Sequence, residues 1–336
     1  MSQLKFKLSL EAKRSNFKIG YQQKIMLVGS CFSENMTAKF AAHQFEVLEN
    51  SHGVLFNPVS VAHSLQDVIE LKTYTAQDIF YHNDIWNSWN HHSRYSGITP
   101  ESSLDKINTS IHSAHQFLKQ ANHIIITLGS AWLYHVEEPA PLGKGQVVAN
   151  NHKGPSQWFK KELMQPNEVK LLLAQMCQNL HAFNPQLHVI FTISPVRHLR
   201  EGLVENNRSK AALIYAVHEL ITQVENIEYF PAYEYVIDDL RDYRFYAEDL
   251  VHPNYAATQY VWEKFVETYM TEDAQGLMKQ VAELQLAMHH KPFFVGSTEH
   301  QKFLQVCIGK TERLLEQYPF LDLTTHLHFF RGQVAK

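Results

Sequence analysis

One short stretch limits what this chain can fold into. Residues 24–35 read KIMLVGSCFSEN, in which the apolar residues 25–28 lead directly to Gly29, Ser30 and Cys31 and a helical pattern follows. This pattern predicts a buried parallel strand, a tight turn and the start of a helix. In open α/β sheets such a bend lies at the carboxyl edge of the strand, where ligands usually bind. We therefore expect small nucleophilic side chains at a ligand-binding edge.

The rest of the chain alternates between strand and helix patterns up to about residue 271. Apolar segments at 123–128 and 187–193, with shorter ones at 45–48 and 227–230, are predicted strands. Strand–helix alternation predicts an α/β fold, a parallel sheet with helices on both faces. Beyond residue 272 only helical patterns remain, which predicts a domain over 20–271 and a helical C-terminal appendage over 272–336. Predicted helices occupy residues 33–45, 59–71, 101–121, 167–183, 206–223, 253–269, 273–289 and 297–318.

Two of the predicted strands should meet at the ligand-binding edge. We expect residues 24–28 and 123–128 to be neighbouring strands, with residues 29–31 and 129–131 side by side at their carboxyl ends. The reason is that loops converge where the strand order of an open α/β sheet reverses.

Composition excludes several classes of function. A net charge of −4 gives no electrostatic footprint for nucleic acid or an anionic membrane. The three widely spaced cysteines argue against a disulfide framework or a zinc motif, and we expect neither a metal nor another cofactor. The N-terminal residues do not resemble a signal peptide, and no apolar run has membrane-spanning length. These features predict a soluble, cytoplasmic protein; they do not indicate its oligomeric state.

A base and an orienting acid follow late in the chain, where Asp249 precedes His252 by three residues. The carboxylate of Asp249 can hold His252 in the tautomer that accepts a proton from a nucleophile, either Cys31 or Ser30. Because a helix N-terminus favours negative charge, we expect a lowered thiol pKa at Cys31. Cys31 should then be alkylated faster than the other two cysteines, which lie in helical patterns: Cys177 and Cys307.

Other polar stretches fit either the site or the scaffold. Residues 72–100 mix aromatic and polar side chains around a hairpin turn at 83–84, and form either a solvated loop or a substrate-facing wall. Residues 133–166 form an insertion that could cover a cleft. Arg197 and His198 follow a predicted strand at the active edge, where Arg197 either binds a substrate carboxylate or phosphate or pairs with a later carboxylate. Arg208 and Lys210 either cap a helix or reach the same pocket. The carboxylates that could pair with Arg197 are Asp238, Asp239 and Asp242.

Seven short blocks support a more specific interpretation. They read GSCF at 29–32, HGVLFNP at 52–58, TLGSAW at 127–132, VANNHK at 148–153, SPVRH at 194–198, NRSKA at 207–211 and YRFYAEDLVHPN at 243–254. Their sequence and order resemble the GSCFA family, which is similar to the SGNH (GDSL-like) hydrolases. The resemblance covers roughly residues 20–270 and implies a flavodoxin-like sheet.

The resemblance also implies roles for individual residues. In the superfamily the nucleophile lies two residues after the glycine that ends the strand, so Cys31 is favoured over Ser30. Gly53 matches the oxyanion donor of the second block, and Asp249 with His252 match the last block. The third block departs from the pattern, because Ala131 stands where the superfamily has Asn and its methyl group donates no hydrogen bond. The candidates to replace that Asn are Ser130 and Asn57.

The predicted function is that of an SGNH-type hydrolase or acyltransferase with a nucleophile–His–Asp triad. Its substrate would be a small molecule or glycan that carries an ester, thioester or other acyl group, bound with the help of Arg197, His198 and Arg208. Backbone N–H groups of the nucleophile turn and of Gly53 would stabilise the oxyanion. The alternative is a binding module that keeps the fold and the pocket without turnover.

Overall fold

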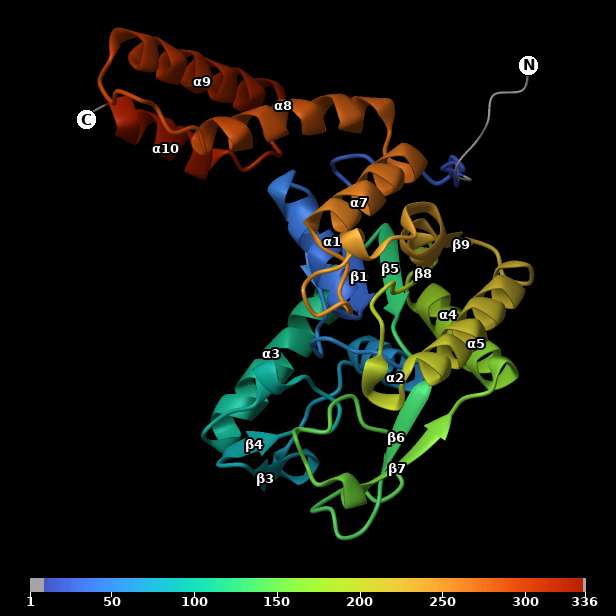
Figure 1. Cartoon of the computed structure of the whole chain (residues 1–336). Helices are drawn as coiled ribbons and strands as arrows, with labels where there is room; N and C mark the ends of the chain where they lie inside the picture. Colours follow the sequence, from blue (N-terminus) through green and yellow to red (C-terminus); the bar gives the residue numbers. More distant parts are fainter. Residues whose placement is uncertain (1–8, 335–336) are drawn as a thin grey trace, which may run out of the picture. The chain divides into compact units, whose positions relative to one another are not determined.

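The computed structural model describes residues 9–334, and within them a five-stranded parallel sheet forms the centre of the fold (Figure 1). Its strands are rich in Ile, Val, Leu and Phe, which suit a strand buried on both faces. Along the sheet the strand order is β2-β1-β5-β8-β9. The bounds are β1 Ile25–Gly29, β2 Val47–Glu49, β5 His123–Leu128, β8 His188–Ile193 and β9 Ile227–Phe230.

The strand order defines the fold class. Counted along the chain, the five parallel strands lie in the order 2-1-3-4-5, which is the flavodoxin-like arrangement. The order reverses between β1 and β5, so the ligand-binding crevice of this fold class lies at their carboxyl ends. Gly29 pairs with Thr127, and the N–H of Ser30 donates to the Thr127 carbonyl over 3.2 Å. The predicted fold class and the predicted adjacency of β1 and β5 are confirmed.

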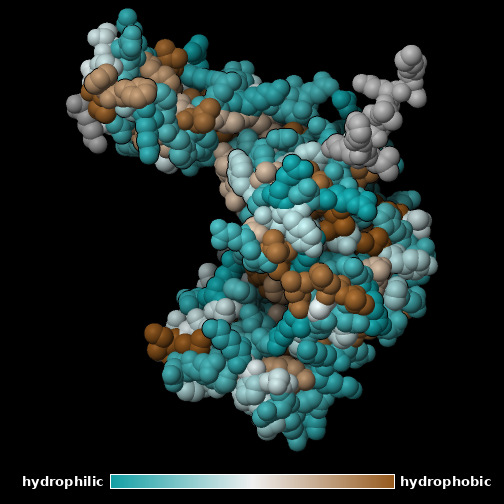
Figure 2. Space-filling view, viewed as in Figure 1, coloured by the Kyte–Doolittle hydropathy of each residue, from teal (hydrophilic) through white to brown (hydrophobic). Residues whose placement is uncertain are grey.

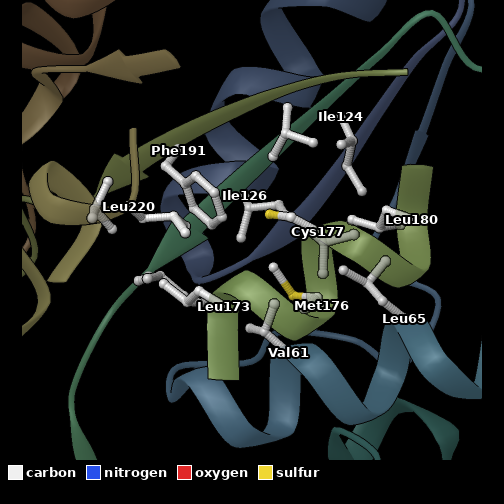
Figure 3. Close-up of a cluster of buried hydrophobic side chains, with 14 of the residues drawn as sticks. Val61, Leu65, Ile124, Ile126, Leu173, Met176, Cys177, Leu180, Phe191 and Leu220 are labelled. Carbon is white, nitrogen blue, oxygen red and sulfur yellow. The ribbon is translucent and has the colours of Figure 1, made fainter. Parts of the chain in front are cut away.

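Helices cover both faces of this sheet. On one face, α2, α4 and α5 bury apolar side chains against Ile124, Ile126 and Phe191 (Figure 3). On the other face, Ser33 of α1 donates to the Thr127 hydroxyl over 2.9 Å, and Phe265 of α7 packs on Phe230. Helix bounds are α1 Cys31–Ala42, α2 Pro58–Glu70, α3 Pro100–Leu118, α4 Pro166–Phe183, α5 Leu203–Ile221, α6 Ala232–Glu234 and α7 Tyr255–Tyr269.

Two hairpins and several short turns connect these elements. The predicted turn at Asn83 and Asp84 is confirmed, because both residues have positive φ and join two antiparallel strands. A second hairpin lies inside the predicted insertion at 133–166. The hairpin strands are β3 Phe80–His82, β4 Ile85–Asn87, β6 Trp132–Val136 and β7 Phe159–Leu163; the short turns are η1 Ala76–Asp78, η2 Ser93–Tyr95, η3 Ser156–Trp158, η4 Leu199–Glu201, η5 Tyr235–Leu240 and η6 Tyr243–Phe245.

The described chain divides into two compact units. The first unit contains the sheet and comprises residues 9–14, 24–37 and 47–268. The second comprises 15–23, 38–46 and 269–334, and includes α8 Glu272–Met288, α9 Thr298–Gln317 and α10 Thr324–Val334. Within this unit, residues 15–23 bind the later segment 269–334, since Ile19 N donates to Tyr269 O over 2.8 Å. Helix α10 was not predicted, and the domain boundaries at 20–271 and 272–336 stay a prediction.

The close approach of β1 and β5 can be tested at Gly29. Its φ is +132°, and a Cβ there would lie 2.1 Å from the Thr127 carbonyl oxygen. We expect Gly29→Ala to destabilise the fold by at least about 3 kcal/mol, because a strained backbone alone costs roughly 1–3 kcal/mol and the clash adds to it. Urea denaturation measures the loss.

Gly145→Ala is the matched control. Gly145 also has a positive φ, of +82°, but nothing lies within 4 Å of the added Cβ. This variant should lose only about 1 kcal/mol, the ordinary cost of a left-handed conformation for an L residue. Equal losses in the two variants would contradict the steric explanation.

Candidate active site

The turn after β1 presents one of its two nucleophilic side chains to the surface. Ser30 is fully buried, and its Oγ accepts a hydrogen bond from Phe32 N over 3.3 Å. Cys31 is partly exposed and is the first residue of α1, two residues before the predicted start of that helix. The helix begins early because Ser33 N already donates to Ser30 O. Of the two candidates, Cys31 is therefore the accessible one.

The predicted pKa shift of Cys31 is wrong in its direction. Burial and the carboxylate of Glu34 raise the pKa of the thiol above its ordinary value. The N–H groups of Cys31 and Phe32 and the charge of Lys210 act in the opposite sense but do not outweigh them. The prediction considered the helix N-terminus and missed Glu34, which lies in the first turn of the same helix. Cys31 therefore needs a base to become a nucleophile at neutral pH.

The base and the acid of the last block lie together. Nδ1 of His252 is 2.7 Å from Oδ2 of Asp249, and Oδ1 of Asp249 accepts from the N–H groups of Val251 and His252. The N–H and ring of His252, with the N–H of Val251, hold the pKa of Asp249 at about 2. Since the carboxylate is ionised, it orients Nδ1 as a donor, which leaves Nε2 as the proton acceptor. The pair has the geometry of the base half of a triad.

Arg197 supports the loop that carries His252. Its guanidinium donates to Leu250 O over 3.0 Å, and its backbone N–H donates to Val251 O. The guanidinium also lies over the ring of Tyr246, with 4.0 Å to the centroid. Of the carboxylates that could pair with Arg197, Asp239 receives the hydroxyl of Tyr260 and Asp242 pairs with Arg244. Arg197 binds backbone carbonyls, and its predicted role in substrate binding stays a prediction.

His198 lies between the reactive groups as a neutral ring. Burial, then the charges of Lys210 and His252, lower the pKa of His198 to about 3. Its Nε2 is buried, lies 3.0 Å from where a Cβ on Gly129 would be, and has no hydrogen-bond partner among the described residues. A buried polar atom without a partner is costly unless a ligand or water satisfies it. His198 therefore fits its predicted role as a substrate-binding residue, a role that stays a prediction.

Lys210 is the functional candidate that the sequence indicated only weakly. It lies on α5 with 2% of its surface exposed, and its Nζ donates to Gly129 O over 2.7 Å and Ser194 O over 2.6 Å. These carbonyls directly follow the carboxyl ends of β5 and β8, so the ammonium lies at the active edge. Burial lowers the pKa of Lys210 to about 7, and the nearby Cys31 thiol raises it. Lys210 precedes the buried residues Leu213 and Val217 by three and seven positions, a spacing that puts all three on one face of the helix. This spacing was the available sign that Lys210 is buried.

The predicted oxyanion donors make other hydrogen bonds. The N–H of Gly53 donates to Asn50 O over 2.7 Å, which closes a turn. Asn57 caps α2 by accepting from Ser60 N over 2.8 Å, while its amide lies 3.4 Å from Val148 O. Ser130 Oγ pairs with Ser209 Oγ and accepts from Trp132 N. The contacts of these three residues do not support an oxyanion role in this structure.

The loop of Gly53 is fixed by a buried carboxylate. His52 Nε2 lies 3.0 Å from Oδ2 of Asp67, and Tyr74 donates to the same oxygen over 2.6 Å. Although burial raises the pKa of Asp67, hydrogen bonds from His52 and His63 hold it well below its usual range. This network positions the second block.

The remaining predicted residue, Arg208, is exposed and pairs with Glu205 on its own helix over 2.9 Å. Its predicted role in substrate binding stays a prediction. Among residues 9–334 no three His, Cys, Asp or Glu side chains lie close enough to hold a metal ion. Within the same residues, every helix is too short or too polar to cross a bilayer.

The fold and the site define an α/β protein with a flavodoxin-like sheet and a thiol, an imidazole and a carboxylate on loops at its carboxyl edge. The chain belongs to the GSCFA family, whose profile matches residues 24–265. A second profile, the GSCFA domain protein C-terminal domain, matches residues 281–336. The predicted resemblance is confirmed. A comparison with curated proteins gives no match.

Several solved structures are loosely similar. A Streptococcus pneumonia protein assigned as a platelet activating factor has a TM-score of 0.39 at 11% identity, with 75% of this chain and 86% of that chain covered. An acetyl xylan esterase from Butyrivibrio proteoclasticus gives 0.37 at 8%, covering 74% and 64%. A carbohydrate esterase of family 3 from Talaromyces cellulolyticus gives 0.36 at 9%, covering 78% and 99%. These likenesses are too loose to assign a function.

The effect of Glu34 on Cys31 gives a test. Because the carboxylate raises the thiol pKa, Glu34→Gln should lower that pKa and increase the thiolate fraction at neutral pH. We expect faster alkylation of Cys31 by iodoacetamide, followed by peptide mass spectrometry. Glu70→Gln, on α2, is the control and should leave the rate unchanged.

The capping role of Asn57 gives a second test. Asn57→Ala should destabilise the protein by about 1 kcal/mol, the usual cost of losing a helix N-cap. Asn57→Asp, which keeps the accepting oxygen, should stay close to the unsubstituted protein in chemical denaturation. A large loss of stability in Asn57→Asp would instead assign the stabilisation to the amide contact with Val148 O.

Proposed function

We propose that this protein is an SGNH-type hydrolase or acyltransferase that acts on an ester, thioester or other acyl group. The observation that carries the proposal is the Asp249–His252 pair, 2.7 Å apart, at the sheet edge where the accessible Cys31 begins α1. The charge of Lys210 lowers the pKa of both Cys31 and His198, and the charge of His252 also lowers the pKa of His198. These electrostatic effects connect Cys31 with the Asp249–His252 pair. All of these residues belong to the first unit.

The proposed reaction has two steps. His252 Nε2 accepts the proton of the Cys31 thiol, and the thiolate attacks the carbonyl carbon of the acyl group. The bond to the leaving alcohol or thiol breaks, the leaving group takes the proton from His252, and a thioester to Cys31 remains. Water or an acceptor hydroxyl then gives its proton to His252 and attacks the thioester, which releases Cys31 as a thiol. Asp249 stabilises the imidazolium in both steps.

The surroundings of the site support an acyl substrate with a polar part. Exposed apolar side chains flank the loops of His198 and His252, and Figure 2 shows such apolar patches on a mostly hydrophilic surface. A pocket beside Arg94 offers hydroxyl, amide and charged groups, but none of the candidate catalytic residues lines it. The exposed apolar residues are Leu199, Leu203, Val204, Tyr243 and Leu250; the pocket is lined by Glu49, Asn50, Arg94, Tyr95, Asp105, Lys106, Thr109 and Ser110.

The second candidate is a binding module without turnover. The observation in its favour is that Gly53, Ser130 and Asn57 all make other hydrogen bonds, so none of these three predicted oxyanion donors is held ready for a substrate. A raised thiol pKa at Cys31 points the same way. For either candidate the three cysteines are free thiols, which supports a reducing compartment, proposed to be the cytoplasm.

Covalent trapping distinguishes the two candidates. A panel of activated esters and thioesters should acylate Cys31, as detected by intact-protein and peptide mass spectrometry. Cys31→Ala should abolish the adduct, whereas His252→Ala should slow its formation by roughly 10²–10⁴-fold, the usual contribution of a general base. Ser30→Ala should retain most of the rate, and Cys177→Ala is the thiol control. An adduct on Ser30 would replace thiol by serine chemistry, and no adduct with any donor would favour the binding module.

A further inference from the structure

Lys210 is buried without the partner that a buried ammonium usually has. No ion pair to Lys210 is found within residues 9–334, and its two hydrogen bonds go to the neutral carbonyls of Gly129 and Ser194. Burying a charge is expensive unless an opposite charge or several hydrogen bonds compensate it. An ammonium has three N–H donors, and the two carbonyls account for two of them. One donor remains for a group at the active edge.

The groups around Lys210 show where that donor can act. Cys31 is the thiol in electrostatic contact with it, His198 is a neutral ring, and the ring of Tyr233 lies 6.0 Å from Nζ. The hydrogen bond to Gly129 O holds Nζ just beyond β5, the strand that pairs with β1, and β1 leads into the turn that carries Cys31. Among the groups named above, only the Cys31 thiol becomes an anion during the proposed reaction, so the ammonium lies at the edge where negative charge develops.

The donors of the third block are either missing or already engaged. Ala131 has no side-chain donor, and its backbone N–H donates to Ser209 Oγ over 2.7 Å. The N–H groups of Gly129 and Ser130 both donate to Phe56 O, and that of Trp132 donates to Ser130 Oγ. The N–H groups of residues 129–132 are all occupied, and what this block offers the site is the Gly129 carbonyl that holds Lys210.

We propose that Lys210 is the cation that stabilises negative charge at the reacting centre, where Ala131 of the third block supplies no side-chain donor. Its ammonium stabilises the Cys31 thiolate and, if the proposed acyl transfer takes place, the oxyanion of the tetrahedral intermediate. The two carbonyls fix Nζ in advance, so the site does not reorganise as charge appears. Only the oxyanion part rests on the proposed function.

The pH dependence of Cys31 alkylation tests this role without a substrate. In the full chain, the rate with iodoacetamide is followed from about pH 6 to about pH 10, a range that spans ordinary thiol titration. Lys210→Gln keeps donor groups but removes the charge, and Lys210→Met removes both. We expect both variants to react about tenfold more slowly at neutral pH, with the midpoint moved upward, since the stabilising charge is lost. Lys210→Arg, which keeps the charge, should restore most of the rate.

Controls separate this role from a structural one. Lys119→Gln removes an exposed charge and should leave the profile unchanged. Protection of the buried Cys177 reports whether each variant is folded. An unchanged alkylation midpoint in folded Lys210→Gln would overturn the proposal and leave Lys210 as a tie between strand ends. A moved midpoint without turnover on any acyl donor would support Lys210 while rejecting the proposed function.

A second measurement leaves Lys210 in place, in case its variants do not fold. The side-chain amine of Lys210 is titrated by NMR in the unsubstituted protein and in Cys31→Ala. Because ionisation of Cys31 favours the protonated form of Lys210, the amine should lose its proton at a lower pH in the variant that has no thiol. An unchanged titration of Lys210 in Cys31→Ala would overturn the proposal.

Discussion

The contact between the end of β1 and the backbone of Thr127 is the constraint on which the site depends. Gly29 has no Cβ, so the two strands approach until Ser30 N reaches the Thr127 carbonyl at 3.2 Å. That hydrogen bond turns Ser30 inward and makes Cys31 the first helical residue. Backbone packing thus exposes Cys31 rather than Ser30, although either side chain has the chemistry of the proposed nucleophile.

Burial sets the charge state of the groups around this turn. It keeps Cys31 protonated, His198 neutral and the pKa of Lys210 near 7, whereas Asp249 at the surface is ionised. A desolvated site strengthens each remaining electrostatic interaction, since fewer water dipoles oppose it. One charge in such a site changes the reactivity of its neighbours more than a surface charge would.

The sequence was sufficient for the fold and for part of the site. Apolar runs such as 123–128 identify buried strands, and the Asp249–His252 spacing is local, so both could be read directly. The oxyanion assignments stay predictions, and local sequence could not reveal the distant hydrogen-bond partners of their side chains: Ser209 for Ser130 and Val148 for Asn57. The predicted direction of the Cys31 pKa shift was wrong because local sequence does not report burial, which has the largest influence on that pKa.

The exposure of the base has a consequence for the choice between hydrolysis and transfer. The side chains of His252 and Asp249 are 50% and 49% exposed, on a loop held by Arg197. In the proposed reaction, bulk water could therefore reach the His252 side chain while Cys31 carries the acyl group as a thioester. Transfer of the acyl group to another molecule would then require the bound acceptor itself to keep water away from His252.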